Sequence, residues 1–123
     1  MRSGKEDLRS PGCIFHFRNQ GAETVATDIM TEEQLGPYAK DALAMGITLE
    51  LGSHRAETFS SCDLIVVSPG VPHTIPPIEA AREKGIEVIG ELELAARQIK
   101  EPIVAITGTN GKTTTTSLVG DML

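Results

Sequence analysis

The residue types best suited to phosphate chemistry lie at positions 103–114, in the order Ile-Val-Ala-Ile-Thr-Gly-Thr-Asn-Gly-Lys-Thr-Thr. The β-branched run 103–107 predicts a buried strand, and residues 108–111 predict a tight loop before a helix that begins at Lys112. Glycines let backbone N–H groups point into such a loop, and a helix N-terminus adds unpaired donors and partial positive charge. The segment therefore predicts a cradle for nucleotide phosphates.

Individual residues of this loop have expected roles. We expect Lys112 to reach the β- and γ-phosphates of a nucleotide, and the Thr113 hydroxyl to bind Mg²⁺. The other residues of the expected phosphate site are Gly108, Thr109, Asn110, Gly111 and Thr114. The general pattern G-x-x-x-x-G-K-[ST] is not complete, because Ile106 stands where it has its first glycine. A threonine-rich helix cap after a turn is the alternative interpretation.

Two further candidates follow predicted strands. Ser68, Pro69 and Gly70 end the apolar run that begins at residue 63, and Asp28 ends a predicted strand at 24–27. Ligands of open α/β sheets bind outside the carboxyl ends of strands. We therefore expect Ser68 and nearby N–H groups to hold a phosphate, and Asp28 to accept hydrogen bonds from a ribose or a base. The alternatives are a simple turn at 68–70 and a helix-capping or solvated carboxylate at Asp28.

Strands and helices that could position these residues alternate along the chain. The predicted strands are 24–27, 47–51, 63–68, 86–89 and 103–107, and the predicted helical segments are 31–34, 37–45, 57–61, 76–84, 91–100 and 112 onward. This alternation predicts βαβ units and a parallel sheet. We expect a Rossmann-like α/β domain with flanking helices at 1–100, and the first strand, P-loop and helix of a truncated second domain at 101–123.

Composition excludes several classes of function. The 123 residues carry a net charge of −6, so the chain is a poor partner for nucleic acids and for anionic membranes. No apolar run approaches the roughly 20 residues that span a bilayer. The first residues have no apolar signal segment. Cys13 and Cys62 have no partner motif, which favours a reducing cytoplasm over a disulfide or zinc scaffold.

Three segments together resemble the Mur ligase family. They are 63–72 (Asp-Leu-Ile-Val-Val-Ser-Pro-Gly-Val-Pro), 90–94 (Gly-Glu-Leu-Glu-Leu) and 104–114, which contains the phosphate loop. The resemblance covers about residues 20–123. The short loop without a first glycine is specific to this family, and Asn110 with the segment 68–72 favours its D-glutamate-adding members.

The resemblance implies a cytoplasmic ligase of peptidoglycan-precursor synthesis that uses ATP and Mg²⁺ and is a monomer as the whole enzyme. Such ligases phosphorylate the carboxylate of UDP-N-acetylmuramoyl-L-alanine, and the amine of D-glutamate then displaces phosphate to form an amide. Carried over to this sequence, the resemblance implies that 108–114 bind ATP, with Lys112 on the phosphates as the catalytic residue and Thr113 on Mg²⁺. It also implies that Asp28 contacts the uracil, and that Ser68, Pro69 and Gly70 line the UDP diphosphate site.

Residues 1–17 depart from the family pattern. The family begins with a strand and a G-x-G-x-[ST]-G loop, of which only Ser3-Gly4-Lys5 remains, so we interpret this stretch as a late start or a shifted reading frame. Residues 13–17 alternate like a strand, and Pro11-Gly12 argues against a helix there. The acidic Mg²⁺ ligand and the D-glutamate domain of the family would follow residue 123, so we expect no ligation by these residues alone.

Other interpretations remain open. Another P-loop amide ligase, such as a folylpolyglutamate synthase, would share the loop but would lack a UDP-binding domain before it. A non-catalytic nucleotide-binding module, or a decayed gene product without activity, would share the elements but not the reaction.

Overall fold

The computed structural model describes residues 11–122, in which four short strands form two separate parallel pairs. Strand β1 (Val25–Asp28) pairs with β2 (Thr48–Leu51), and β3 (Leu64–Val67) pairs with β4 (Glu87–Gly90). The helices are α1 (Pro11–Asn19), α2 (Glu32–Leu35), α3 (Pro37–Ala44), α4 (Ala56–Ser61), α5 (Pro76–Glu83), α6 (Glu91–Gln98) and α7 (Lys112–Met122). The predicted α/β class with parallel strands and flanking helices is confirmed.

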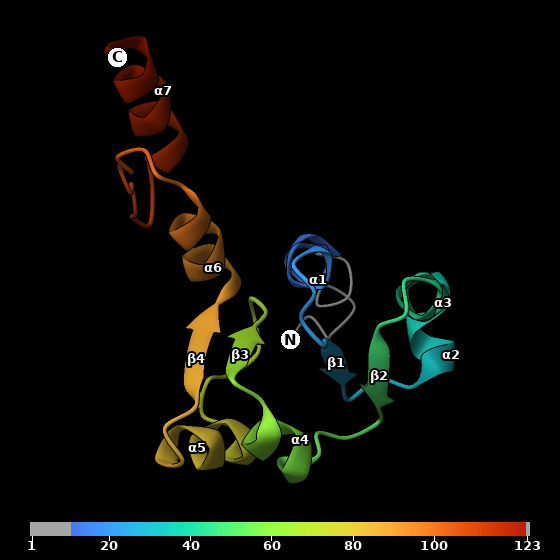
Figure 1. Cartoon of the computed structure of the whole chain (residues 1–123). Coiled ribbons are helices and arrows are strands. Elements are labelled where there is room, and N and C mark those ends of the chain that lie inside the picture. The colour runs from blue at the N-terminus through green and yellow to red at the C-terminus, as the bar shows by residue number, and fades with distance from the viewer. Residues whose placement is uncertain (1–10, 123) are drawn as a thin grey trace.

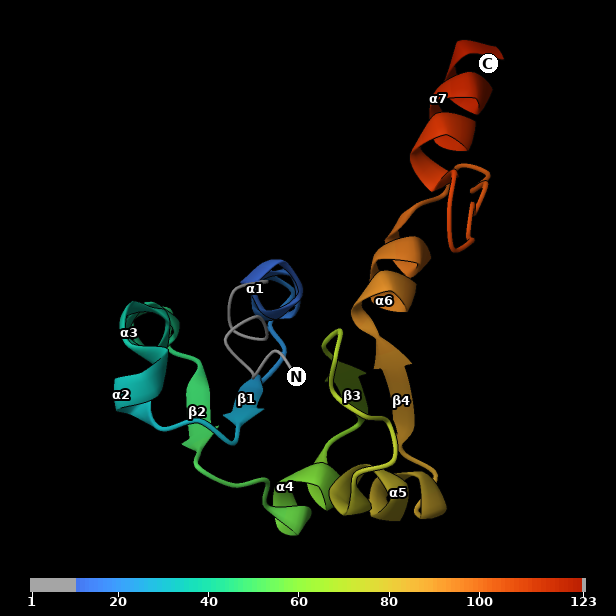
Figure 2. The ribbon, with the colours of Figure 1, turned by 180° about the vertical axis from the view of Figure 1, so that it is seen from behind.

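The expected single Rossmann-like sheet is not what the structure contains. The two pairs lie side by side and run in opposite directions, with β1 and β2 directed toward the end where α4 lies, and β3 and β4 directed toward α6 (Figure 1; Figure 2 from behind). Within residues 11–122 no strand pairs with both β1 and β3. Because a sheet is continuous only through neighbouring hydrogen-bonded strands, the two pairs remain two sheets.

Each sheet packs against its own hydrophobic cluster. The first cluster lies between the β1–β2 pair and helices α2 and α3, and its buried members are Met30, Leu35, Ala39, Ala42 and Ile47. The second lies between the β3–β4 pair and helices α4 and α5, and its buried members are Phe59, Val67, Ile78 and Ala81. Aliphatic side chains and alanines dominate both clusters, which the near absence of aromatic residues from the sequence requires.

Local signals set the ends of several helices as the sequence predicts. Thr31 caps α2, because its hydroxyl accepts a hydrogen bond from the Gln34 N–H (3.4 Å) while the Gln34 side chain accepts one from the Thr31 N–H (2.9 Å). Helices α3 and α5 begin at Pro37 and Pro76, where the missing proline N–H would have had no partner within the helix.

Two sequence predictions of local structure are wrong. Residues 103–107 form no strand, and Ile103 and Val104 are 54% and 66% exposed. A strand needs a neighbour for its backbone groups, and none lies beside this segment in the described chain. Residues 13–17 form part of α1 rather than a strand, because Pro11 is the first helical residue, a position that tolerates proline, and does not break the helix.

The chain exposes more surface than a compact protein of its size. Its accessible area is 8737 Å², whereas a folded monomer of 13.1 kDa exposes about 6,400 Å². Helix α7 accounts for part of the excess, because it has no buried residue and extends beyond α6 away from both sheets (Figure 1). The packed part of the structure therefore ends with α6.

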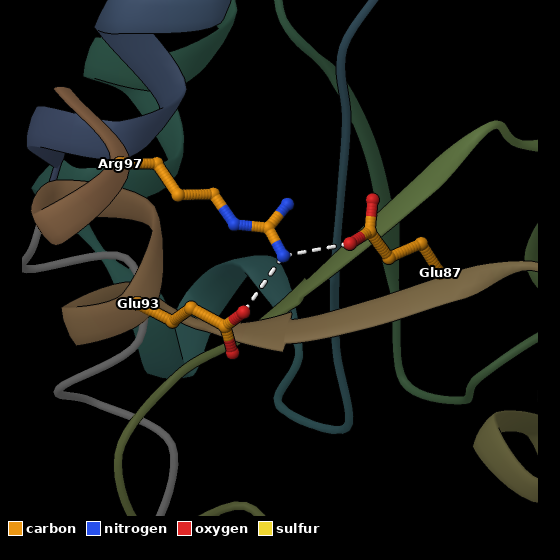
Figure 3. Close-up of polar contacts among 3 residues, drawn as sticks. All are labelled: Glu87, Glu93 and Arg97. Atoms are coloured by element: carbon orange, nitrogen blue, oxygen red, sulfur yellow. Dashed lines mark hydrogen bonds and ion pairs between the residues drawn. The ribbon is translucent and has the colours of Figure 1, made fainter.

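An ion-pair cluster joins α6 to β4. One guanidinium nitrogen of Arg97 lies 2.7 Å from a carboxylate oxygen of Glu87 on β4 and 2.7 Å from one of Glu93 on its own helix (Figure 3). The hydrogen bond from Arg97, followed by its charge, lowers the pKa of the Glu87 carboxyl, and the two glutamates raise the pKa of Arg97. All three side chains are substantially exposed, so solvent screens the pairs.

Glu87→Gln should remove a small pH-dependent part of the stability. Because the folded-state pKa of Glu87 lies below its ordinary value of 4.5, its contribution is present above that pH and is lost as the pH falls through the folded-state pKa. The melting temperature of the variant should therefore lie slightly below that of the wild type at about pH 7, and the two should converge as the pH falls below 4.5 and through the folded-state pKa of Glu87. Glu83→Gln, on exposed α5 surface, is the control; a constant difference at all pH values would contradict the prediction.

Candidate functional site

Asp28 is a buried polar residue at the carboxyl end of β1. Asp28 is 3% exposed. The other buried residues of the described chain are hydrophobic, so Asp28 is the one buried residue there with a charged or polar side chain. One carboxyl oxygen, Oδ1, accepts a hydrogen bond from the Met30 N–H (2.8 Å), whereas Oδ2 is buried without a hydrogen-bond partner in residues 11–122. An unpaired buried oxygen lowers stability, so its presence is a sign of a functional position.

The surroundings of Asp28 include a hollow on the α2 side of the first sheet. The Gly52 N–H donates to the Asp28 carbonyl (2.9 Å), and Gly52 also lines a hollow of about 380 Å³. The other lining residues are Thr31, Glu32, Leu43, Leu49 and Leu51. The hollow is open to solvent, and Asp28 itself does not line it. Gly52 is therefore the residue that joins the hollow to the carboxyl end of β1.

Residues 68–71 form a tight turn at the carboxyl end of β3. The Val71 N–H donates to the Ser68 carbonyl (3.2 Å), Pro69 occupies the second position, and Gly70 has a φ of 93°. This combination is typical of a type II turn, which requires a residue that tolerates positive φ at its third position. The Ser68 hydroxyl donates to Glu91 Oε1 at 2.7 Å, in a partly buried contact between the ends of β3 and β4.

The two candidate substrate positions are not brought together. Asp28 lies at the end of β1, and Ser68 lies at the end of β3, and the two sheets point in opposite directions (Figures 1 and 2). In a single parallel sheet, the carboxyl ends of all strands lie along the same edge. The sequence analysis expects Asp28 and Ser68 to contact one ligand for this reason. The structure thus separates residues that the prediction places in a single site.

The loop predicted to bind phosphate is curled and exposed. Residues 102–111 form an irregular loop before α7, and Gly111 has a φ of 78°, which favours glycine at that position. The Lys112 ammonium group contacts the Gly108 carbonyl, so the lysine side chain folds back over the loop. The first hydrogen bond of the helix runs from the Thr115 N–H to the Gly111 carbonyl (2.9 Å), which leaves the preceding amides without helical acceptors.

These residues fit a nucleotide phosphate better than they fit a metal ion alone. The backbone amides of residues 112–114, the helix dipole and the Lys112 charge all favour an anion. Thr113 supplies one hydroxyl oxygen, and the described residues contain no cluster of three His, Cys, Asp or Glu that could hold a metal. A Mg²⁺ ion at Thr113 would therefore depend on the oxygens of the nucleotide for most of its ligands.

Two contacts near these positions are not evident from the sequence. Glu91 is the partner of Ser68, and the signal that could reveal it is its place directly after β4, the neighbour of β3. His54 Nδ1 lies 2.7 Å from the Thr27 hydroxyl, and its ring packs edge-on against Phe59. His54 thereby joins the loop after β2 to β1 and to α4.

The fold is that of a small α/β protein with parallel strands and flanking helices, and comparison with known proteins gives the family. Residues 10–90 match the family described as "Mur ligase MurD-like, N-terminal domain". The chain therefore belongs to the MurD-like branch of the Mur ligases, through their N-terminal domain.

Named relatives agree with the family. The chain is 58% identical over 105 residues to UDP-N-acetylmuramoylalanine–D-glutamate ligase of Desulfatibacillum aliphaticivorans, which covers 85% of this chain and 23% of the relative. It is 47% identical over 110 residues to the protein of that name in Pelobacter propionicus, which covers 89% of this chain and 25% of the relative. The chain thus spans about a quarter of the length of these relatives.

A solved structure is similar to the chain in fold. The structure of a pseudomurein peptide ligase type C from Methanothermus fervidus has a TM-score of 0.57 and 25% sequence identity over 98% of this chain and 24% of that protein. As for membranes, none of the helices in residues 11–122 has the length and apolar character needed to cross one.

Proposed function

We propose that this chain is the sugar-nucleotide-binding part of a cytoplasmic, ATP-dependent ligase that adds D-glutamate to UDP-N-acetylmuramoyl-L-alanine in peptidoglycan-precursor synthesis. Residues 1–100 would bind the UDP-sugar, and residues 101–123 would begin the ATP-binding domain. The oxygen Oδ2 of Asp28 at the carboxyl end of β1 carries the proposal, because it has no hydrogen-bond partner within residues 11–122 and a ligand donor would supply one by displacing the atoms that cover it. The names of the relatives supply the substrate.

The uracil is the part of the ligand that suits Asp28. Uracil presents a ring N–H donor, and a carboxyl oxygen is its natural acceptor. The hollow beside Gly52 has apolar side chains for one face of a base, including Leu49 and Leu51. For the same ligand to contact Ser68, Pro69 and Gly70, the β3–β4 pair would have to run in the direction of the β1–β2 pair within one sheet.

The ATP contacts in this proposal come from the loop and the start of α7. Lys112 would leave the Gly108 carbonyl and contact the terminal phosphates, while the amides of residues 108–114 surround them. ATP supplies the phosphoryl group that activates the substrate carboxylate, and Thr113 would provide one ligand to its Mg²⁺. The attacking amine of D-glutamate would be bound outside these 123 residues.

Separate calorimetric titrations of the 123-residue chain test the proposal. We expect UDP-N-acetylmuramoyl-L-alanine to bind with a saturable isotherm, and we expect no release of phosphate from ATP when both substrates and Mg²⁺ are present. ATP binding without sugar-nucleotide binding would instead favour a general nucleotide-binding module. Absence of binding by either ligand would favour a decayed gene product and would contradict the proposal.

A further inference from the structure

The hydrogen bond between Ser68 and Glu91 determines what Ser68 can offer to a ligand. A serine hydroxyl has one proton, and a carboxylate can only accept. The contact of 2.7 Å therefore directs that proton to Glu91 Oε1, and the Ser68 oxygen presents its lone pairs to the other side. Ser68 in this state is an acceptor.

A phosphate is a poor partner for this arrangement. Phosphate oxygens are acceptors, so they cannot donate to Ser68, and the negative charge of Glu91 repels them. A sugar hydroxyl or an amide N–H can donate to Ser68 and meets no such repulsion. The pair of side chains thus suits the sugar-peptide part of a sugar nucleotide better than its diphosphate.

We propose that Glu91 is a positioning residue that holds Ser68 as an acceptor for a hydroxyl or amide donor of the sugar-peptide portion, and so favours UDP-sugar over UDP. This inference rests on the proposed function, including the single-direction sheet that would bring Ser68 and Asp28 to one ligand. It assigns Ser68 to a different part of that ligand from the diphosphate that the sequence analysis expects.

The backbone on both sides holds the pair in place. Val67 and Gly90 are register partners in the β3–β4 ladder, so the residues that follow them start from adjacent positions. The 68–71 turn fixes the end of β3, and Glu91 is the first residue of α6, which Arg97 ties to β4. A purely structural role is the competing explanation, since an acidic residue in the first turn also favours the helix.

Calorimetry with two ligands separates these roles. UDP and UDP-N-acetylmuramoyl-L-alanine are each titrated into the wild-type chain and into Ser68→Ala, Glu91→Ala and Glu91→Gln, with folding monitored by circular dichroism. The control is Glu93→Gln, which removes the same charge from the same helical turn but affects Arg97 instead of Ser68.

We expect Ser68→Ala and Glu91→Ala to weaken binding of the UDP-sugar about three- to tenfold, the loss typical of one neutral hydrogen bond, while binding of UDP is unchanged. Glu91→Gln keeps an acceptor oxygen and should retain most of the preference for the UDP-sugar. A structural role would weaken both ligands alike and would leave their affinity ratio unchanged.

The results that would overturn this inference differ from the result that would overturn the proposed function. Equal losses for UDP and the UDP-sugar in Ser68→Ala would show that the contact is structural or that Ser68 faces the diphosphate, and either result would overturn the inference alone. Tighter UDP binding by Glu91→Gln would show that Glu91 repels the diphosphate at this position and would overturn it as well. Wild-type affinity in all variants would also overturn it. Failure of the wild-type chain to bind either ligand would overturn the proposed function and, with it, this inference.

Discussion

Asp28→Asn should weaken binding of UDP-N-acetylmuramoyl-L-alanine by about ten- to a hundredfold, because a hydrogen bond to a charged group contributes about 1.5–3 kcal/mol and 1.4 kcal/mol is tenfold. The substitution keeps Oδ1, which accepts from the Met30 N–H, and replaces the unpartnered Oδ2 by an amide donor. A donor cannot accept from the uracil N–H. The affinity of the variant for UDP should therefore fall as well as its affinity for the UDP-sugar.

The same variant should be at least as stable as the wild type. Folding buries Oδ2 without a partner, and an uncharged amide is easier to bury than a carboxylate. The expected combination of weaker binding and undiminished stability is characteristic of a residue kept for function.

Calorimetry with both ligands and urea unfolding measure the two effects. Asp41→Asn, which changes the same side chain at an exposed position of α3, should alter neither. The assignment of Asp28 would be wrong if Asp28→Asn bound UDP as the wild type does, or if it lost stability together with affinity.

Ile78→Ala should destabilise the chain by about 2–5 kcal/mol, the range for truncation of a buried isoleucine. Ile78 is 1% exposed and belongs to the second hydrophobic cluster, with Phe59 and Val67. The loss combines the transfer free energy of the removed atoms with a cavity that its neighbours only partly fill. Because folded domains are stable by only about 5–15 kcal/mol, this one change could unfold a large share of the molecules.

Urea unfolding and hydrogen exchange test this prediction. Leu92→Ala on α6 removes an aliphatic side chain that is 85% exposed, and should change stability by less than about 0.5 kcal/mol. Since the two clusters share no buried residue, amides of β3 and β4 should lose protection before those of β1 and β2. Equal loss of amide protection in all four strands would show that the two clusters unfold as one cooperative unit. A stability change for Ile78→Ala as small as that for Leu92→Ala would contradict the observed packing of Ile78.

The sequence predicts most local elements within one or two residues. The strands expected at 24–27, 47–51, 63–68 and 86–89 correspond to β1, β2, β3 and β4, and the caps at Thr31, Pro37 and Pro76 are confirmed. These features depend on residues that are neighbours along the chain, so periodicity and capping chemistry suffice to find them. The family resemblance is confirmed as well.

The errors arise where structure depends on distant partners. The run at 103–107 has the composition of a buried strand, but within residues 11–122 no strand lies beside it, and so it is an exposed, irregular segment. In residues 11–17 the position of Pro11 at the start of α1 outweighs the strand-like alternation. Glu91 could be placed beside Ser68 only after β3 and β4 were known to pair.

The sequence by itself determined the α/β class, the family and the chemical types of the candidate residues, because these follow from side-chain identity and short-range spacing. Tertiary structure alone decided that the strands form two sheets of opposite direction and that the Ser68 hydroxyl donates to Glu91. It also decided that one oxygen of Asp28 is buried with no hydrogen-bond partner among residues 11–122. Strand pairing, burial and hydrogen-bond direction are properties of groups brought together from distant parts of the chain, and local pattern does not specify them.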